Sequence, residues 1–202
     1  INRDIFIRTF CLLTAFGIFT ARGAQMGDVT LAANAVLYQF LTFSSHGLDA
    51  FAHAAEALVG GAKGRRDKAG FHEASKVALL WGLSIAAGAT AVFFVAGPYI
   101  IDGLTGIPEV RETANTYLFW AAIMPVIAVW CFTLDGIFIG ATRSVDLRNS
   151  MLITFIGYLA ALVVLEHAFG NHGLWASLVV LMVLRGVTLG LRYPALLRSI
   201  DG

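Results

Sequence analysis

Charge is scarce in this sequence. Of its 202 residues, 13% are Asp, Glu, Lys or Arg, about half the share found in an ordinary soluble domain. The 14 basic residues nearly balance the 13 acidic ones, so there is no basic excess to neutralise the phosphates of a nucleic acid. Hydrophobic residues make up 58% of the chain and the mean hydropathy is +0.76, which excludes a soluble globule. We therefore expect an integral membrane protein that binds no nucleic acid.

Cysteine and recognisable catalytic motifs are also rare or missing. Cys11 and Cys131 lie in apolar stretches, without the spacing of a disulfide framework or a metal site. The sequence has no HExxH pair, P-loop or dinucleotide fingerprint. Residues 82–86 approach a nucleophile elbow but lack its final glycine. We therefore predict a protein that is not an enzyme, with no catalytic residues, no cofactor and no metal.

Long apolar stretches fill most of the chain. A membrane-spanning helix needs roughly 20 apolar residues, and six segments meet this length, at about 5–24, 29–61, 77–101, 115–141, 150–166 and 174–197. They lack the alternation of transmembrane strands. We predict an all-α membrane protein in which residues 1–202 form one bundle of six transmembrane helices. We expect the third helix to break at Gly97-Pro98, and residues 102–108 of the outer connection over 97–112 to form turns.

Basic residues are distributed unevenly between the connections. If the six segments alternate in direction, eleven Lys and Arg residues fall on one side of the membrane and two on the other. Such residues accumulate on the cytoplasmic side, so we expect both ends of this segment to be cytoplasmic. We expect Arg8, near the end of the first segment, to reach the lipid headgroups. The sequence opens at Ile1 with no signal-peptide pattern that ends in a small-residue cleavage site, and we expect it to be a piece of a longer polypeptide.

Polar residues recur at helical spacing in the second segment. Intervals of three or four residues place them on one narrow helix face: Gln39, Thr42, His46, Asp49, His53 and Glu56. Because such a face is costly against lipid, we expect it to line a water-filled cavity of a transport pathway. Alternatively, its groups bond to one another and to neighbouring helices. We include Asn34, on the same helix, among the cavity-lining candidates.

Two further charges lie deep in the later segments. Asp135 is the only charged residue of the fourth segment, and Arg185 lies near the middle of the sixth. A desolvated carboxylate can take up a proton or bind a cation, which makes Asp135 a candidate coupling site. The alternative is an ion pair of Asp135 with Arg143 or Arg185. Arg185 itself needs an acidic partner among Asp49, Asp135 and Glu56, and we expect it to form a structural intramembrane ion pair.

Four stretches of the sequence resemble a known family of transporters. They are NRDIFIRT at 2–9, LAANAVL at 31–37, LDAFAHAAEALVG at 48–60 and LDGIFIGA at 134–141. Together they are similar to the multidrug and toxic compound extrusion (MATE) family, in its DinF-like branch. The resemblance covers the C-terminal six-helix lobe, which is half of a twelve-helix transporter.

The resemblance implies a secondary active antiporter. Such a protein exports amphipathic or cationic drugs and toxins in exchange for H⁺ or Na⁺, by alternating access of two lobes. The implied partners are small amphipathic substrates, membrane lipid and the N-terminal six-helix lobe of the same protein, and the implied location is the bacterial plasma membrane. Asp135 matches the acid that helps to bind the coupling cation in sodium-coupled relatives. The glutamate that those relatives place in the first helix is missing from 11–19.

Two alternative functions remain open at this point. One is a flippase of the same superfamily that moves a lipid-linked substrate, since such proteins share the plan of two lobes. The other is a carrier of metal cations. His46, Asp49, His53 and Glu56 offer imidazole and carboxylate groups at helical neighbour spacing, and a second helix would have to complete the site.

Overall fold

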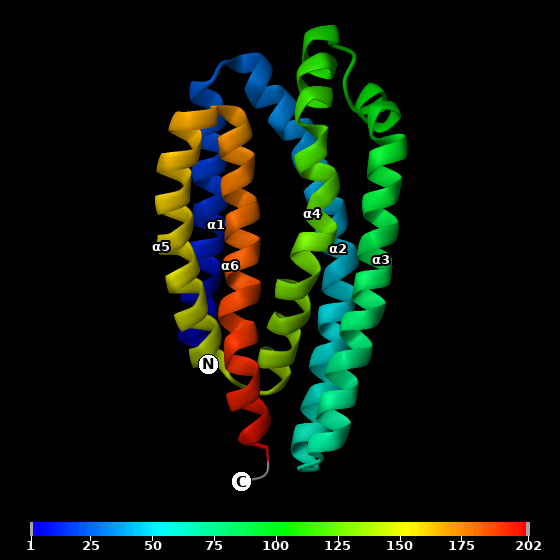
Figure 1. Ribbon diagram of the computed structural model, residues 1–202, viewed down its shortest axis with the longest axis vertical. Coiled ribbons are helices and arrows are strands. Elements are labelled where there is room, and N and C mark those ends of the chain that lie inside the picture. The colour runs from blue at the N-terminus through cyan, green and yellow to red at the C-terminus, as the bar shows by residue number, and fades with distance from the viewer. Residues whose placement is uncertain (1, 201–202) are drawn as a thin grey trace.

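A computed structural model describes residues 2–200, and nearly all of them are helical. The helices are α1 Asn2–Gln25, α2 Asp28–Gly64, α3 Lys68–Leu104, α4 Pro108–Gly140, α5 Ser144–Phe169 and α6 Asn171–Arg198. Helices α1, α5 and α6 form one group and α2, α3 and α4 form another, and α4 packs on α6 to join the two groups (Figure 1). The predicted all-α bundle of six helices is confirmed.

Five of the described helices are long and apolar enough to cross a membrane. The sixth, α2, has 37 residues but falls outside this group, because polar side chains recur along it and interrupt its apolar stretches. It nevertheless packs along α4 and α3 in the bundle. The molecule is an integral membrane protein.

Short connections hold successive helices side by side. The Asp67 side chain accepts a hydrogen bond from the backbone amide of Gly70 at 2.8 Å and caps α3. Pro108 opens α4, where the lack of an amide hydrogen does no harm. Gly170 joins α5 to α6 with a φ of 56°, a backbone conformation that glycine adopts without strain.

Helix α3 is longer than its sequence indicates. It continues through Gly97-Pro98 to Leu104, and only residues 105–107 connect it to α4. The expected break at Gly97-Pro98 is therefore wrong, and the turns expected over 102–108 are confined to residues 105–107. Membrane helices tolerate proline when neighbouring groups satisfy the freed backbone. The short connection is closed by Arg111, whose Nε donates to the carbonyl oxygen of Thr105 at 2.7 Å.

The basic connections share one end of the bundle, which we call the basic end. Residues 65–67 join α2 to α3 and residues 141–143 join α4 to α5, and both connections lie at the end where α1 begins and α6 finishes (Figure 1). The other three connections lie at the opposite end. The fold thus gathers the basic loops on one side, as the alternation of the six segments requires.

The interior contains two apolar clusters with charged residues between them. The smaller cluster includes Phe71, Phe138 and Leu189 near the basic end, and the larger one fills the rest of the bundle. Asp135 lies between the clusters on α4, and Arg185 lies between them on α6. The apolar core is therefore interrupted by charged side chains at one depth of the bundle.

Helix α4 approaches α2 through two glycines. A Cβ atom on Gly136 would collide with the backbone of Ala52, and one on Gly140 would collide with the backbone of Glu56. Glycines four residues apart allow such close backbone contact between membrane helices. This contact fixes the rotation of α2, and with it the direction in which the polar residues of α2 point.

Candidate transport site

The polar residues of α2 lie mainly on its exposed side. Gln39, His46, Asp49 and His53 are exposed, whereas Thr42 and Glu56 are half-buried. We call these six residues the α2 polar face. The periodicity of the sequence therefore identified a real face of the helix.

Few of the polar side chains on this face form hydrogen bonds with the rest of the bundle. His46 Nδ1 contacts the carbonyl oxygen of Thr42 one turn earlier at 2.6 Å, and His53 Nδ1 lies 3.4 Å from Glu56 Oε2. His53 is 79% exposed. Within residues 2–200, no side chain of the α2 polar face hydrogen-bonds to another helix. The bonds that these side chains do form are therefore with one another or with their own helix.

The α2 polar face does not form a metal site by itself. Among the residues that the structure describes, no group of three or more His, Cys, Asp or Glu side chains is placed to hold a metal ion. Helix geometry explains this, because the ten helical steps from His46 to Glu56 span about 15 Å. The four candidate ligands are spread along the helix, and only His53 and Glu56 touch.

Asp135 is the centre of a buried ion-pair triad. Its Oδ2 accepts hydrogen bonds from Nη2 of Arg8 and from Nη2 of Arg185. Asp135 and Arg185 are buried, and the Arg8 side chain is 16% exposed. The guanidinium of Arg185 also lies over the Phe132 ring, 5.5 Å from its centroid, which adds a cation–π attraction. The triad links α1, α4 and α6.

The structure thus chooses among the ion pairs that the sequence left open. Arg185 pairs with Asp135. Arg143, in the connection before α5, instead donates to Asp146 in the first turn of α5 at 2.7 Å. Asp49 and Glu56 form no salt bridge with Arg185 in the described part of the chain.

The charge of the triad is not balanced by its own members. Two guanidinium groups and one carboxylate carry a net charge of +1, and an uncompensated charge in a membrane interior is costly. Asp49 is near enough to attract both Arg8 and Arg185 electrostatically. When Asp49 is ionised, the four groups sum to zero. Asp135 Oδ1 and Arg185 Nε and Nη1 have no hydrogen-bond partner among residues 2–200.

Arg8 is a functional candidate that the sequence pattern did not reveal. Its position near the end of the first segment predicted a side chain at the headgroups. In the structure it lies six residues into α1, about 9 Å along the helix, and turns inward to Asp135. A charge count could have pointed to it, because the second and fourth segments hold three acids, Asp49, Glu56 and Asp135, while Arg185 is the only base counted inside the membrane.

Asn34 does not line a cavity, so its assignment from sequence is corrected. It is 3% exposed. Its amide donates to Asn171 Oδ1 at 2.7 Å, and its Oδ1 accepts from Asn171 Nδ2 at 3.0 Å and from Trp175 Nε1 at 2.9 Å. Asn34 lies with Leu37 on the buried side of α2. Its side chain therefore links α2 to α6 and does not belong to the α2 polar face.

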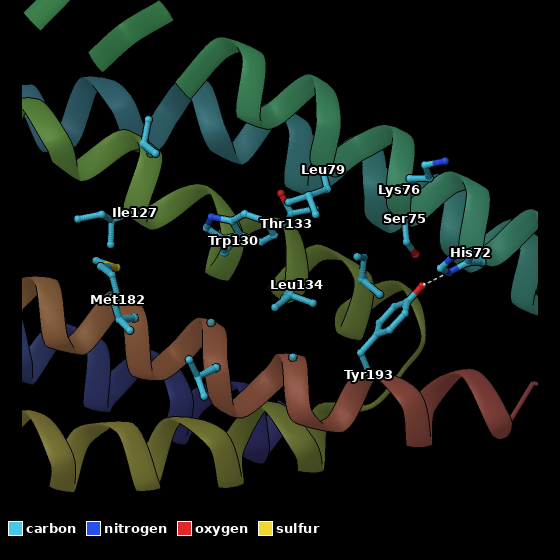
Figure 2. Close-up of a pocket in the computed structure, with 16 residues that line it drawn as sticks. His72, Ser75, Lys76, Leu79, Ile127, Trp130, Thr133, Leu134, Met182 and Tyr193 are labelled. Atoms are coloured by element: carbon cyan, nitrogen blue, oxygen red, sulfur yellow. Dashed lines mark hydrogen bonds between the residues drawn. The ribbon is translucent and has the colours of Figure 1, made fainter. Parts of the chain in front are cut away.

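A separate cavity of about 680 Å³ lies between α3 and α6, with α4 as its third wall (Figure 2). We call it the α3–α6 groove. Its walls are largely apolar, and polar side chains gather toward the basic end, where His72 Nδ1 and Tyr193 Oη are 3.1 Å apart. No residue of α2 lines it. Helix α4 therefore contributes to the groove on one side and packs on α2 on another.

Transport proteins are among those built as all-helical membrane bundles with a polar helix face, and comparison with known families identifies which class this chain belongs to. The sequence model of the MatE family matches residues 5–165, which is well over half of the chain. The chain belongs to the MATE family of transporters, and it is not an enzyme.

Two curated relatives support this assignment. The chain is 41% identical over 189 residues to DNA damage-inducible protein F from Escherichia coli, and the match covers 94% of this chain and 41% of that protein. It is 30% identical over 181 residues to Protein DETOXIFICATION 44, chloroplastic, from Arabidopsis thaliana, covering 88% and 34% of the two chains. The chain thus spans less than half the length of the curated relatives it matches.

Solved structures show the same fold. The chain matches a crystal structure of the Vibrio cholerae MATE transporter VcmN in the bent form with a TM-score of 0.88 at 19% identity, covering 98% of this chain and 45% of that one. The six helices therefore have the fold of one lobe of a MATE transporter.

Proposed function

We propose that this lobe works with a second six-helix lobe as an antiporter, which exports small amphipathic or cationic compounds in exchange for H⁺ or Na⁺ by alternating access. The α2 polar face is the observation that carries the proposal. Exposed polar groups along a helix of an apolar bundle are unfavourable against lipid, so we infer that this face lines a polar cavity between two lobes. The proposal places the protein in a bacterial plasma membrane with the basic end in the cytoplasm.

Asp49 is the carboxylate that we assign to coupling. It belongs to the α2 polar face and is exposed, so a proton can reach it from the cavity. It also attracts Arg8 and Arg185 electrostatically. Protonation of Asp49 changes the charge of the group of four from zero to +1, and removal of the proton restores neutrality. This change in local charge can bias one lobe orientation over another.

Asp135 was the coupling candidate that the sequence favoured, and the geometry supports it less well. A cation at its carboxylate would meet two guanidinium groups already bound to Oδ2. Protonation of Asp135 would leave both guanidinium groups without their partner. We therefore propose that Asp135 holds Arg8 and Arg185 in place. A direct coupling role for Asp135 stays a prediction that the same experiment tests.

The experiment measures uptake of a fluorescent lipophilic cation into everted membrane vesicles that contain the full transporter. Transport is driven by an imposed pH gradient or, separately, by a Na⁺ gradient. Asp49→Asn keeps the shape of the side chain but cannot titrate, so we expect it to abolish the dependence of transport on the pH gradient. Asp28→Asn, at the opposite end of the same helix, is the matched control and should behave as the unsubstituted protein.

Each other outcome assigns the function differently. Normal proton-driven uptake by Asp49→Asn would overturn the role of Asp49. Loss of coupling in a correctly folded Asp135→Asn variant would transfer that role to Asp135. If the unsubstituted protein moves no cation but flips a fluorescent lipid-linked sugar, the antiporter proposal is wrong and the flippase alternative is right.

A further inference from the structure

We propose that the α3–α6 groove binds one anionic phospholipid from the leaflet at the basic end. An acyl chain of the lipid lies along α4, and its phosphate lies beside Lys76 and His72. This site is separate from the α2 polar face and from the proposed antiport, because none of its lining residues belongs to α2.

The walls of the groove fit a hydrocarbon chain. Its volume of about 680 Å³ falls in the range of small-molecule sites. Apolar side chains of all three helices line it, and Trp130, Val183 and Val187 among them are about half exposed. Helices α3 and α6 barely touch each other, so the groove is open along their gap. An apolar groove that is open within the membrane is accessible to lipid chains.

The length of the groove matches one leaflet. Its lining on α4 runs from Val126 to Ile137 and its lining on α6 runs from Met182 to Tyr193. Each stretch covers eleven helical steps, or about 17 Å. Half of a hydrocarbon core of about 30 Å is about 15 Å. The groove therefore extends from the interface at the basic end to about the middle of the membrane, which is the depth that a single acyl chain occupies.

The polar end of the groove suits a phosphate. His72 and Lys76 are four residues apart on α3 and therefore share a helix face, and the Tyr193 hydroxyl faces His72 from α6 (Figure 2). Lys76 is exposed and forms no salt bridge within residues 2–200, so its flexible ammonium is available to an anion at the interface. Basic pockets between membrane helices at this depth favour anionic headgroups.

Two other occupants fit the groove less well. A helix from a second copy of the chain would cross the whole membrane, whereas the groove ends near its middle. A transported solute would need a route to the α2 polar face, and α4 lies in between, packed against α2 through Gly136 and Gly140. The half-membrane length and the basic end together favour a lipid.

Native mass spectrometry of the full transporter in detergent tests the proposal. Phosphatidylglycerol and phosphatidylcholine with identical acyl chains are titrated separately, and the bound fraction gives an apparent Kd for each. Gly190→Phe fills the groove, because Gly190 lines it and a Cβ atom there meets nothing within 4 Å. Gly88→Phe is the matched control, since Gly88 on α3 has equally open surroundings but does not line the groove.

A second pair of variants tests the headgroup. Lys76→Gln removes the cation beside the groove, and Lys68→Gln removes one from the same end of α3 that does not line it. We expect the unsubstituted protein to bind one phosphatidylglycerol more tightly than phosphatidylcholine. Gly190→Phe should lose binding of both lipids. Lys76→Gln should weaken phosphatidylglycerol binding about fivefold and phosphatidylcholine binding less, because the choline group already offsets part of the charge of its phosphate. Both controls should bind as the unsubstituted protein does.

The result that overturns the proposal is unchanged lipid binding by Gly190→Phe. Displacement of phosphatidylglycerol by millimolar glycerol phosphate would show an anion site without a chain-binding groove. If the protein is instead a dimer that Gly190→Phe dissociates, the groove binds a second copy of this chain. Thermal unfolding checks that each variant folds. If Gly190→Phe does not fold, the smaller Gly190→Leu takes its place with Gly88→Leu as its control.

Discussion

At the scale of single residues, one carboxylate connects three helices. Asp135 on α4 accepts hydrogen bonds from Arg8 on α1 and Arg185 on α6, between two apolar clusters. A buried pair adds little net stability over a well-packed apolar pair, but the loss of one partner leaves the other charge buried and uncompensated. The triad therefore acts mainly as a constraint, because it permits only arrangements in which all three side chains meet.

This constraint predicts a loss of stability in Asp135→Asn. The substitution leaves two guanidinium groups with a neutral partner, so we expect the free energy of unfolding to fall by about 3 kcal/mol, or about 6–12 °C in Tm for a chain of this size. Removal of one guanidinium as well, in Asp135→Asn with Arg8→Gln, should restore part of the loss. Thermal unfolding in detergent measures each change.

A less buried ion pair provides the control for this prediction. Asp146→Asn breaks the bond to Arg143, whose side chain is 39% exposed, and should cost less than about 1 kcal/mol. If Asp135→Asn is as stable as the unsubstituted protein, the triad is not the constraint described above. Asp135 would then be the exchangeable cation or proton site that the sequence suggested.

Residues whose position depends on spacing within one helix could be predicted from the sequence. Residues whose position depends on contacts with other helices could not. The α2 polar face follows from intervals of three and four residues, and the structure reproduces it. Asn34 lies five residues before Gln39 and so falls outside this spacing, and its partners Asn171 and Trp175 lie on α6, where no pattern within α2 reveals them. Arg8 was misplaced for the same reason, since its partners are more than 120 residues away in the chain.

At the scale of helices, the contact between α2 and α4 orients the α2 polar face. Gly136 and Gly140 remove two side chains from this contact, and the backbone of α2 fills the space. Larger residues would push the helices apart and rotate the face. The existence of each helix was predictable from apolar length, but this orientation was not, because it depends on which two helices meet. The end of α3 was also missed, since the proline rule for soluble helices does not hold in a bundle.

Gly140→Ala should therefore destabilise the lobe. The added methyl group collides with the backbone of Glu56, which cannot move as a flexible side chain can, so we expect a loss of about 1–3 kcal/mol. Gly88→Ala is the control, because a Cβ atom at Gly88 meets nothing within 4 Å. Chemical denaturation followed by circular dichroism compares the two. Equal stability of both variants would mean that α2 and α4 are not held at this separation.

At the scale of the whole molecule, α4 separates two surfaces of opposite character. It packs on α2, which carries the exposed polar face, and it also forms one wall of the apolar α3–α6 groove. A lobe with these two surfaces is suited to meet water or a second lobe on one side and lipid on another. The direction of transport through such a lobe depends on which end faces the cytoplasm, and the distribution of basic residues addresses that question.

The orientation can be tested with thiol labelling in whole cells. Arg66 lies in the connection between α2 and α3 at the basic end, and Gly106 lies in the connection between α3 and α4 at the opposite end; both are exposed. Because Lys and Arg resist translocation, we expect a membrane-impermeant maleimide to label Gly106→Cys in intact cells and to label Arg66→Cys only after lysis. The unsubstituted protein is the control, since Cys11 and Cys131 are both buried and should not react. Labelling of Arg66→Cys in intact cells would reverse the orientation, and the lipid in the α3–α6 groove would then come from the outer leaflet.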